Sequence, residues 1–171
     1  MHRGGFFYFC AMNKEISTLV KVRFSDCDPI GHLNNVKYLE YMMNAREDHV
    51  ESYYGFTYEE YSRKTGCTWI TVQNEIAYLR EVRFNSKVQI SSKTIEVRDR
   101  ISKVEILMKS EDGKTINAVL WITVIYFNMK TRKSEIHPPE TRGMFEEFLT
   151  EVPEKTFAER VAFFRKQNKS A

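Results

Sequence analysis

The spacing of apolar residues between positions 34 and 66 predicts two helices. Within residues 36–54 apolar side chains recur every three or four positions, the pattern of a long amphipathic helix. Asn34 or Asn35 can cap its start, and Gly55 is a natural stop. Thr57, with Glu60 three residues later, is typical of a capping box that opens a short helix ending near Gly66.

The remaining pattern predicts strands. Residues 18–24 alternate, with Val20, Val22 and Phe24 on one face. Beyond Gly66, four stretches are rich in Ile, Val, Thr and aromatic residues: 67–79, 87–97, 102–109 and 115–127. Short polar connections, including the Glu-Asp-Gly-Lys turn at 111–114, favour antiparallel pairing, so we expect these four strands to form a meander. Residues 118–127 are apolar on both faces and should lie centrally in the sheet.

These elements predict an α+β domain in which a five-stranded antiparallel sheet wraps one long central helix. After Pro138-Pro139 the chain becomes helical and charged, roughly over 140–149 and 155–166. We therefore divide the chain into a peripheral N-terminal extension (1–13), the main domain (14–137) and a C-terminal helical tail (138–171). Translation from Met12 instead of Met1 is an alternative start.

Composition narrows the class of protein. At 171 residues and 42% apolar content the chain can bury one core. A net charge of +3, spread over the sequence, does not indicate nucleic-acid binding but is compatible with a small polyanionic ligand. Three cysteines without a CxxC pair argue against disulfides or zinc and for a reducing, cytoplasmic compartment. The most apolar stretch, 118–127, is about half the length of a membrane span.

The segment between the first strand and the long helix concentrates reactive groups. Asp26, Asp28 and His32 lie directly before a helix N-terminus, where unpaired N–H groups and a partial positive charge can stabilise an oxyanion. A carboxylate there could act as a general base or attack an acyl carbon itself. The alternative is ordinary turn and capping chemistry, since Asp before Pro and Gly is common in turns.

A family resemblance favours a catalytic role for this segment over ordinary turn chemistry. Residues 22–41, VRFSDCDPIGHLNNVKYLEY, followed by Ala45-Arg46, resemble the signature of hot-dog fold acyl-CoA thioesterases of the 4-hydroxybenzoyl-CoA thioesterase-like family. The likeness extends more loosely to about Phe127 and leaves out residues 1–13 and the tail after Pro139. The His-Leu-Asn-Asn run is similar to the branch that includes fatty acyl thioesterases.

The resemblance implies roles for individual residues. Asp28 would be the catalytic carboxylate, either nucleophile or base, and the backbone N–H of Asn35 the oxyanion donor. His32 would support catalysis or orient substrate, whereas Asp26 would be structural. Two departures leave the proton transfers open: Ile30 stands where plant acyl-carrier-protein enzymes have Asn, and Asn44 where many bacterial relatives have an acid.

Further residues are expected to bind substrate. Relatives often place groups near the CoA phosphates at the turn that here contains Arg98, Arg100 and Ser102, although a solvated hairpin is an equal alternative. The cluster of Tyr38, Tyr41, Met42, Met43 and Trp69 could line an acyl pocket or simply form core. Tyr38 and, next to the catalytic segment, Asn34 are included among the expected substrate-binding residues.

The resulting functional hypothesis is hydrolysis of an acyl-CoA, most simply a fatty acyl-CoA, without metal or redox cofactor. Acyl-carrier-protein thioesters are the less favoured substrate. A homodimer that completes the site across its interface, or a homotetramer, is implied by the resemblance, and no nucleic acid or membrane partner is expected. The alternatives are a non-catalytic acyl-ligand binding or regulatory protein on the same fold, and a hot-dog hydratase or dehydratase.

Overall fold

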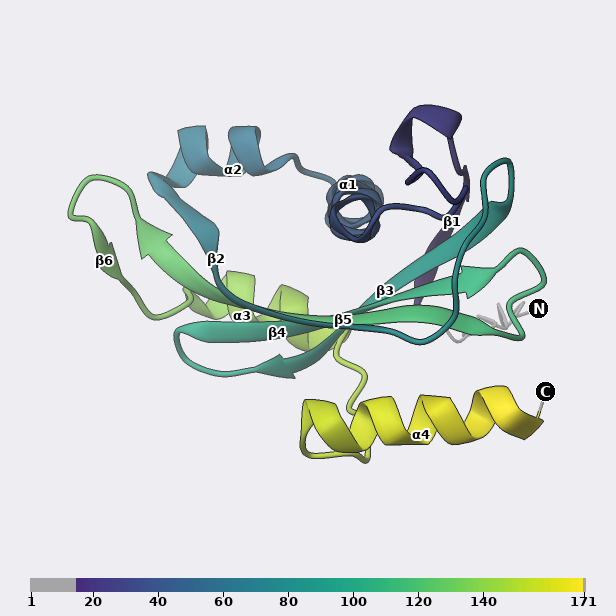
Figure 1. Ribbon diagram of the computed structural model, residues 1–171. Coiled ribbons are helices and arrows are strands. Elements are labelled where there is room, and N and C mark those ends of the chain that lie inside the picture. Colours follow the sequence, from purple (N-terminus) through teal and green to yellow (C-terminus); the bar gives the residue numbers. More distant parts are fainter. Residues whose placement is uncertain (1–14, 171) are drawn as a thin grey trace, which may run out of the picture.

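A computed structural model describes residues 15–170 (Figure 1); the predicted extension 1–13 lies outside this range. The helices are α1 (Asn35–Tyr54), α2 (Tyr58–Thr65), α3 (Pro139–Glu147) and α4 (Phe157–Ser170), with a 3-10 turn at Phe24–Asp26. The strands are β1 (Ile16–Lys21), β2 (Cys67–Tyr78), β3 (Lys87–Val97), β4 (Ile101–Ser110), β5 (Ile116–Asn128) and the short β6 (Lys133–Ser134). No helix in residues 15–170 is both long and apolar enough to cross a bilayer.

The five long strands form one antiparallel sheet in the order β1-β3-β4-β5-β2, and β6 adds to the end of β5. The predicted α+β hot-dog architecture is confirmed: α1, which Figure 1 shows along its axis, packs against the concave face of a curled sheet. The predicted four-strand meander is wrong in one respect. Only β3, β4 and β5 follow one another, because β2 pairs with β5 and not with its sequence neighbour β3.

Local signals define the two helices on the concave side. The Asn34 side chain accepts a hydrogen bond from the N–H of Val36, and Gly55 ends α1 in the left-handed region at φ 70°. Thr57 and Glu60 make both hydrogen bonds of the expected capping box. The predicted boundaries of these helices are therefore confirmed to within one residue.

Side chains on the two sheet faces build two separate cores. On the concave face, Tyr38, Met42 and Ala45 of α1 pack against strand residues such as Ile106 and Leu120. On the convex face α4 covers the sheet (Figure 1), and its apolar side chains pack on the strands. This second core consists of Ile95, Leu107, Ile116, Val119, Trp121, Val161 and Phe164. Burial on both sides explains why residues 118–127 are apolar on both faces.

One buried histidine links α1 to the sheet. His49 is 1% exposed; its ring nitrogens lie 2.7 Å from the hydroxyl of Ser92 and 2.9 Å from that of Thr18. Burial, and then the charge of Arg46, lower the pKa of His49 from 6.5 to about 4. The fold therefore favours the neutral imidazole.

This lowered pKa predicts acid sensitivity. Above about pH 6.5 the imidazole is neutral whether the chain is folded or unfolded, so its contribution is fully present. Between about pH 6.5 and 4 only the unfolded chain takes up the proton, and the free energy of unfolding should fall by roughly 2–3 kcal/mol. Urea unfolding at several pH values measures this. His49→Gln, which keeps hydrogen-bonding groups but does not titrate, should lose that part of the slope; an unchanged slope would contradict the assignment.

Candidate active site

The segment between β1 and α1 folds into a compact turn. Cys27 bridges Leu33 in antiparallel fashion, and the N–H of Asp28 donates to the carbonyl of His32 at 2.7 Å. Gly31 has φ 82°, a conformation that a residue with a Cβ adopts rarely. Pro29 excludes helix from the residue before it. The turn therefore positions Asp28 and His32 at the entrance of α1.

Only one oxygen of the Asp28 carboxylate is used by the turn. Its Oδ1 accepts hydrogen bonds from the N–H groups of Ile30 at 3.0 Å and His32 at 2.9 Å. Within residues 15–170 its Oδ2 has no hydrogen-bond partner, and the residue is half-buried. The turn interpretation is therefore confirmed for Oδ1, and the reactive role of Asp28 stays a prediction that the unpartnered Oδ2 leaves open.

The start of α1 offers an unpaired donor. Asn34 is the N-cap, so its side chain binds the N–H of Val36 at 3.1 Å. Asn35 is the first helical residue and is exposed, and the described part of the chain supplies no acceptor for its N–H. The first N–H groups of a helix lack intrahelical partners and carry the positive end of its dipole. The Asn35 N–H is therefore available to an oxygen of a bound ligand.

His32 has a partner that sequence reasoning missed. Its Nε2 lies 3.2 Å from a carboxylate oxygen of Glu81, which comes from the connection after β2. The backbone of His32 also bridges that of Arg83. No spacing along the chain indicates that residue 81 meets residue 32, because the two come together only when the β2–β3 connection passes the helix start.

Asp26 is held by structural contacts. Its Oδ2 accepts from the Tyr41 hydroxyl at 2.7 Å, and Lys37 lies 3.7 Å from its Oδ1. Burial, followed by this hydrogen bond to Asp26, raises the pKa of Tyr41. Both carboxylate oxygens of Asp26 face residues of α1, which agrees with the structural role that the resemblance implies.

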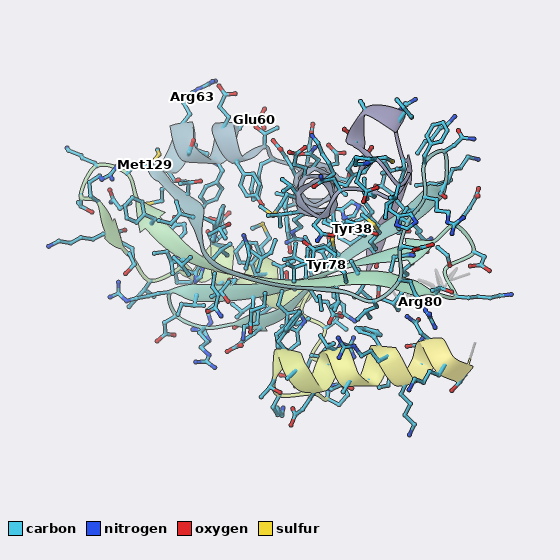
Figure 2. The ribbon with its side chains drawn as sticks, in the orientation of Figure 1. Tyr38, Glu60, Arg63, Tyr78, Arg80 and Met129 are labelled. Atoms are coloured by element: carbon cyan, nitrogen blue, oxygen red, sulfur yellow. The ribbon has the colours of Figure 1, made fainter. Side chains whose placement is uncertain are left out.

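Tyr38 belongs to the core. It is 3% exposed, and its hydroxyl accepts from the N–H of Val82 at 3.0 Å. Figure 2 shows Tyr38 and Tyr78 together between α1 and the sheet, with ring centroids 5.1 Å apart. Tyr78 in turn donates to the carbonyl of Asn35 at 3.1 Å. The two tyrosines thus connect the helix start to the sheet. Because Tyr38 is almost completely buried, its position argues against the expected contact with substrate.

The three residues expected near CoA phosphates are not brought to Asp28 within one chain. Arg98 and Arg100 are exposed in the β3–β4 turn, at the opposite end of β3 from the Asp28 turn, a strand of about 30 Å. Ser102 differs from them, because it is 3% exposed and lines a cavity on the concave side of the sheet. Its side chain therefore lies on the concave side of the sheet, away from the exposed Arg98 and Arg100, and its contact with substrate stays a prediction.

The expected apolar pocket cluster also divides. Met43 and Trp69 line the cavity on the concave side, whereas Met42 is completely buried in the concave core. Tyr41 lies beside Asp26. Met43 and Trp69 therefore share one cavity, whereas Tyr41 lines a separate surface pocket beside Asp26.

A long helix in a curled sheet, with a half-buried aspartate before the helix start, defines the class. The sequence profile of the thioesterase-like superfamily matches residues 22–152, so the chain belongs to that superfamily. This confirms the family resemblance and the expected class of enzyme, a thioester hydrolase.

Similar proteins agree with this assignment. The chain is 24% identical over 134 residues to the long-chain acyl-CoA thioesterase FadM of Escherichia coli K12, covering 78% of this chain and 99% of FadM. Among solved structures, YbaW, a probable thioesterase from E. coli, has a TM-score of 0.69 at 23% identity, covering 78% of this chain and 98% of YbaW. SAV2348 from Staphylococcus aureus, in complex with CoA, has a TM-score of 0.74 at 16% identity, covering 86% and 91% of the two chains. The two structures share the fold with this chain.

Proposed function

We propose that the protein hydrolyses acyl-CoA thioesters to free acid and CoA, with Asp28 as the catalytic carboxylate. The observation that carries the proposal is that Oδ2 of Asp28 has no hydrogen-bond partner among residues 15–170, in the turn that leads directly into the helix start. There the N–H of Asn35 has no acceptor among the same residues. The fatty acyl preference and the use of CoA are supported by the similarity to FadM, described as a long-chain acyl-CoA thioesterase.

In the reaction, Asp28 takes a proton from a water molecule as the water oxygen attacks the thioester carbonyl carbon. The carbonyl oxygen becomes an oxyanion, which accepts a hydrogen bond from the Asn35 N–H. Collapse of this intermediate re-forms the carbonyl and breaks the C–S bond, and the thiolate leaves and takes up a proton. Alternatively, Asp28 attacks the carbon itself, the C–S bond breaks and the thiolate leaves and takes up a proton; water then hydrolyses the resulting mixed anhydride to the free acid and the Asp28 carboxylate. In either route His32, whose Nε2 contacts Glu81, assists the Asp28 carboxylate.

A homodimer would complete the site. β2 is an edge strand of twelve residues, and on it Ile70 is 37% and Val72 54% exposed. Long apolar edges are open to pairing with another strand. If two β2 edges pair antiparallel, the Asp28 end of one protomer lies beside the β3–β4 turn of its partner. Arg98 and Arg100 of the partner subunit would then provide the expected cations for CoA phosphates.

We also place this enzyme in the cytoplasm, as its cysteine content predicts.

Thiol release from a panel of acyl-CoA thioesters tests the proposal. We expect multiple-turnover release of CoA from at least one aliphatic acyl-CoA, followed with a thiol reagent, and weaker release from acyl-carrier-protein thioesters. An acyl-binding protein without catalysis would bind the same panel but release no thiol. Absence of turnover on every aliphatic and aromatic thioester would reject the proposed activity.

A further inference from the structure

A cavity of about 160 Å³, partly open to solvent, lies between the C-terminal half of α1, the concave sheet face and α3. Most of its wall is apolar, contributed by Met43, Val50, Phe56, Trp69, Val104, Ile122, Val124 and Phe145. A cavity of about 150 Å³ with apolar walls is large enough for benzene. The space therefore fits one ring or a branched group of about six carbons.

The same wall carries a cation that no carboxylate neutralises. Arg46 of α1 lines the cavity, and it donates to the hydroxyl of Ser92 at 3.2 Å and lies 5.9 Å from the centre of the Tyr54 ring. Among residues 15–170 no carboxylate oxygen lies within 4.0 Å of it. A guanidinium has five N–H donors, and partly buried charges are normally paired. Arg46 thus retains donors for an oxygen inside the cavity.

A second polar group faces the same space. Ser102 is 3% exposed and lines the cavity, yet its hydroxyl has no hydrogen-bond partner among the described residues. Because strand side chains alternate, Ser102 and Val104 share the concave face of β4. A buried hydroxyl without a partner is costly and needs an explanation, such as a water or ligand oxygen. Arg46 and Ser102 come from opposite walls, the helix and the sheet.

We propose that this cavity binds a compact apolar group that carries a carboxylate or another acceptor oxygen, recognised by Arg46 and Ser102. The apolar wall accommodates the ring or branched chain, and the two donors bind the oxygen. The cavity lies about 16 Å along α1 from Asn35, at a rise of 1.5 Å per residue. If the chain hydrolyses thioesters at Asp28, the site takes the end of the acyl group remote from the sulfur; this assignment alone rests on the proposed function.

Calorimetric titration of the full chain with benzoate and cyclohexanecarboxylate tests the site without any hydrolysis. We expect saturable binding with Kd near or below about 1 mM and a matching rise in thermal stability. Arg46→Met should weaken binding at least tenfold, and Ser102→Ala about fivefold. The control is Lys103→Met, which removes a positive charge as Arg46→Met does. Lys103 follows Ser102 on β4 but pairs with Glu96 outside the cavity, so this variant should bind like wild type.

Three outcomes would overturn the proposal. One is no binding of either acid up to about 10 mM, which is the result for a cavity that holds water only. Another is equal binding by wild type and Arg46→Met, which would exclude recognition of the oxygen. The third is equally tight binding of toluene, which would make the site purely apolar. Ser102→Ala guards against misfolding as an explanation, since it removes only one unpaired hydroxyl. Asp28→Asn should bind both acids as wild type does, because Asp28 does not line the cavity. The binding test therefore gives the same answer whether or not the proposed hydrolysis occurs.

Discussion

Replacing Asp28 with Asn is expected to reduce kcat for acyl-CoA hydrolysis by at least about 100-fold, the lower end of what a positioned acid–base group contributes. The amide retains an oxygen that can accept from the N–H groups of Ile30 and His32, so the turn should keep its shape. It cannot take a proton from water or attack the acyl carbon. KM should change little, because the loss falls on the chemical step.

Asp26→Asn is the matched control for this substitution. It makes the same chemical change two residues away, at a carboxylate whose oxygens face Tyr41 and Lys37. We expect a decrease in kcat of less than about tenfold, together with a small loss of stability, because the Tyr41 hydroxyl is left with a weaker acceptor. Steady-state thiol release from both variants decides the matter. Wild-type rates for Asp28→Asn, or a larger loss for Asp26→Asn, would refute the assignment.

Replacing Arg160 with Met is expected to give the largest loss of stability, about 3 kcal/mol or more in the free energy of unfolding. Arg160 of α4 binds both carboxylate oxygens of Glu105, at 2.7 and 2.8 Å. Glu105 is 1% exposed and also accepts from the indole N–H of Trp121 at 2.9 Å. Burial raises the pKa of Glu105, but the hydrogen bonds from Arg160 and Trp121 outweigh it and hold the pKa below its usual value.

Stability is lost because the substitution leaves the buried Glu105 carboxylate without its main partner. Lys93 remains 3.4 Å from Glu105, but the bidentate partner is lost. Urea unfolding measures the effect. The double variant Glu105→Leu/Arg160→Met should recover part of it, because the fully buried carboxylate is removed together with its partner. Recovery should be incomplete, because Glu154 also loses its contact with Arg160. Arg63→Met, which breaks an exposed pair with Glu59, should cost less than about 1 kcal/mol. A loss at Arg160 no larger than that at Arg63 would contradict the prediction.

Local sequence signals were sufficient for most of the secondary structure. The caps at Asn34, Gly55 and Thr57 and the run of β3 at residues 87–97 were predicted within one residue. These features depend on backbone groups that neighbours in the chain satisfy, so the chain itself carries the information. The position of β2 beyond β5 could not be obtained in this way, because strand order depends on contacts between residues far apart in the sequence.

The candidate site likewise has features that the sequence predicts and features that only the tertiary structure reveals. The sequence by itself determined the turn that contains Asp28, the helix start at Asn35 and, through the family signature, the class of thioester hydrolase. These groups are contiguous in the chain, so their spacing fixes their geometry. The pairing of His32 with Glu81, the distance of Arg98 from Asp28 and the burial of Ser102 beside Arg46 were decided only by the tertiary structure. Each joins segments that meet through curvature of the sheet and packing on α1, which no local pattern of residues encodes.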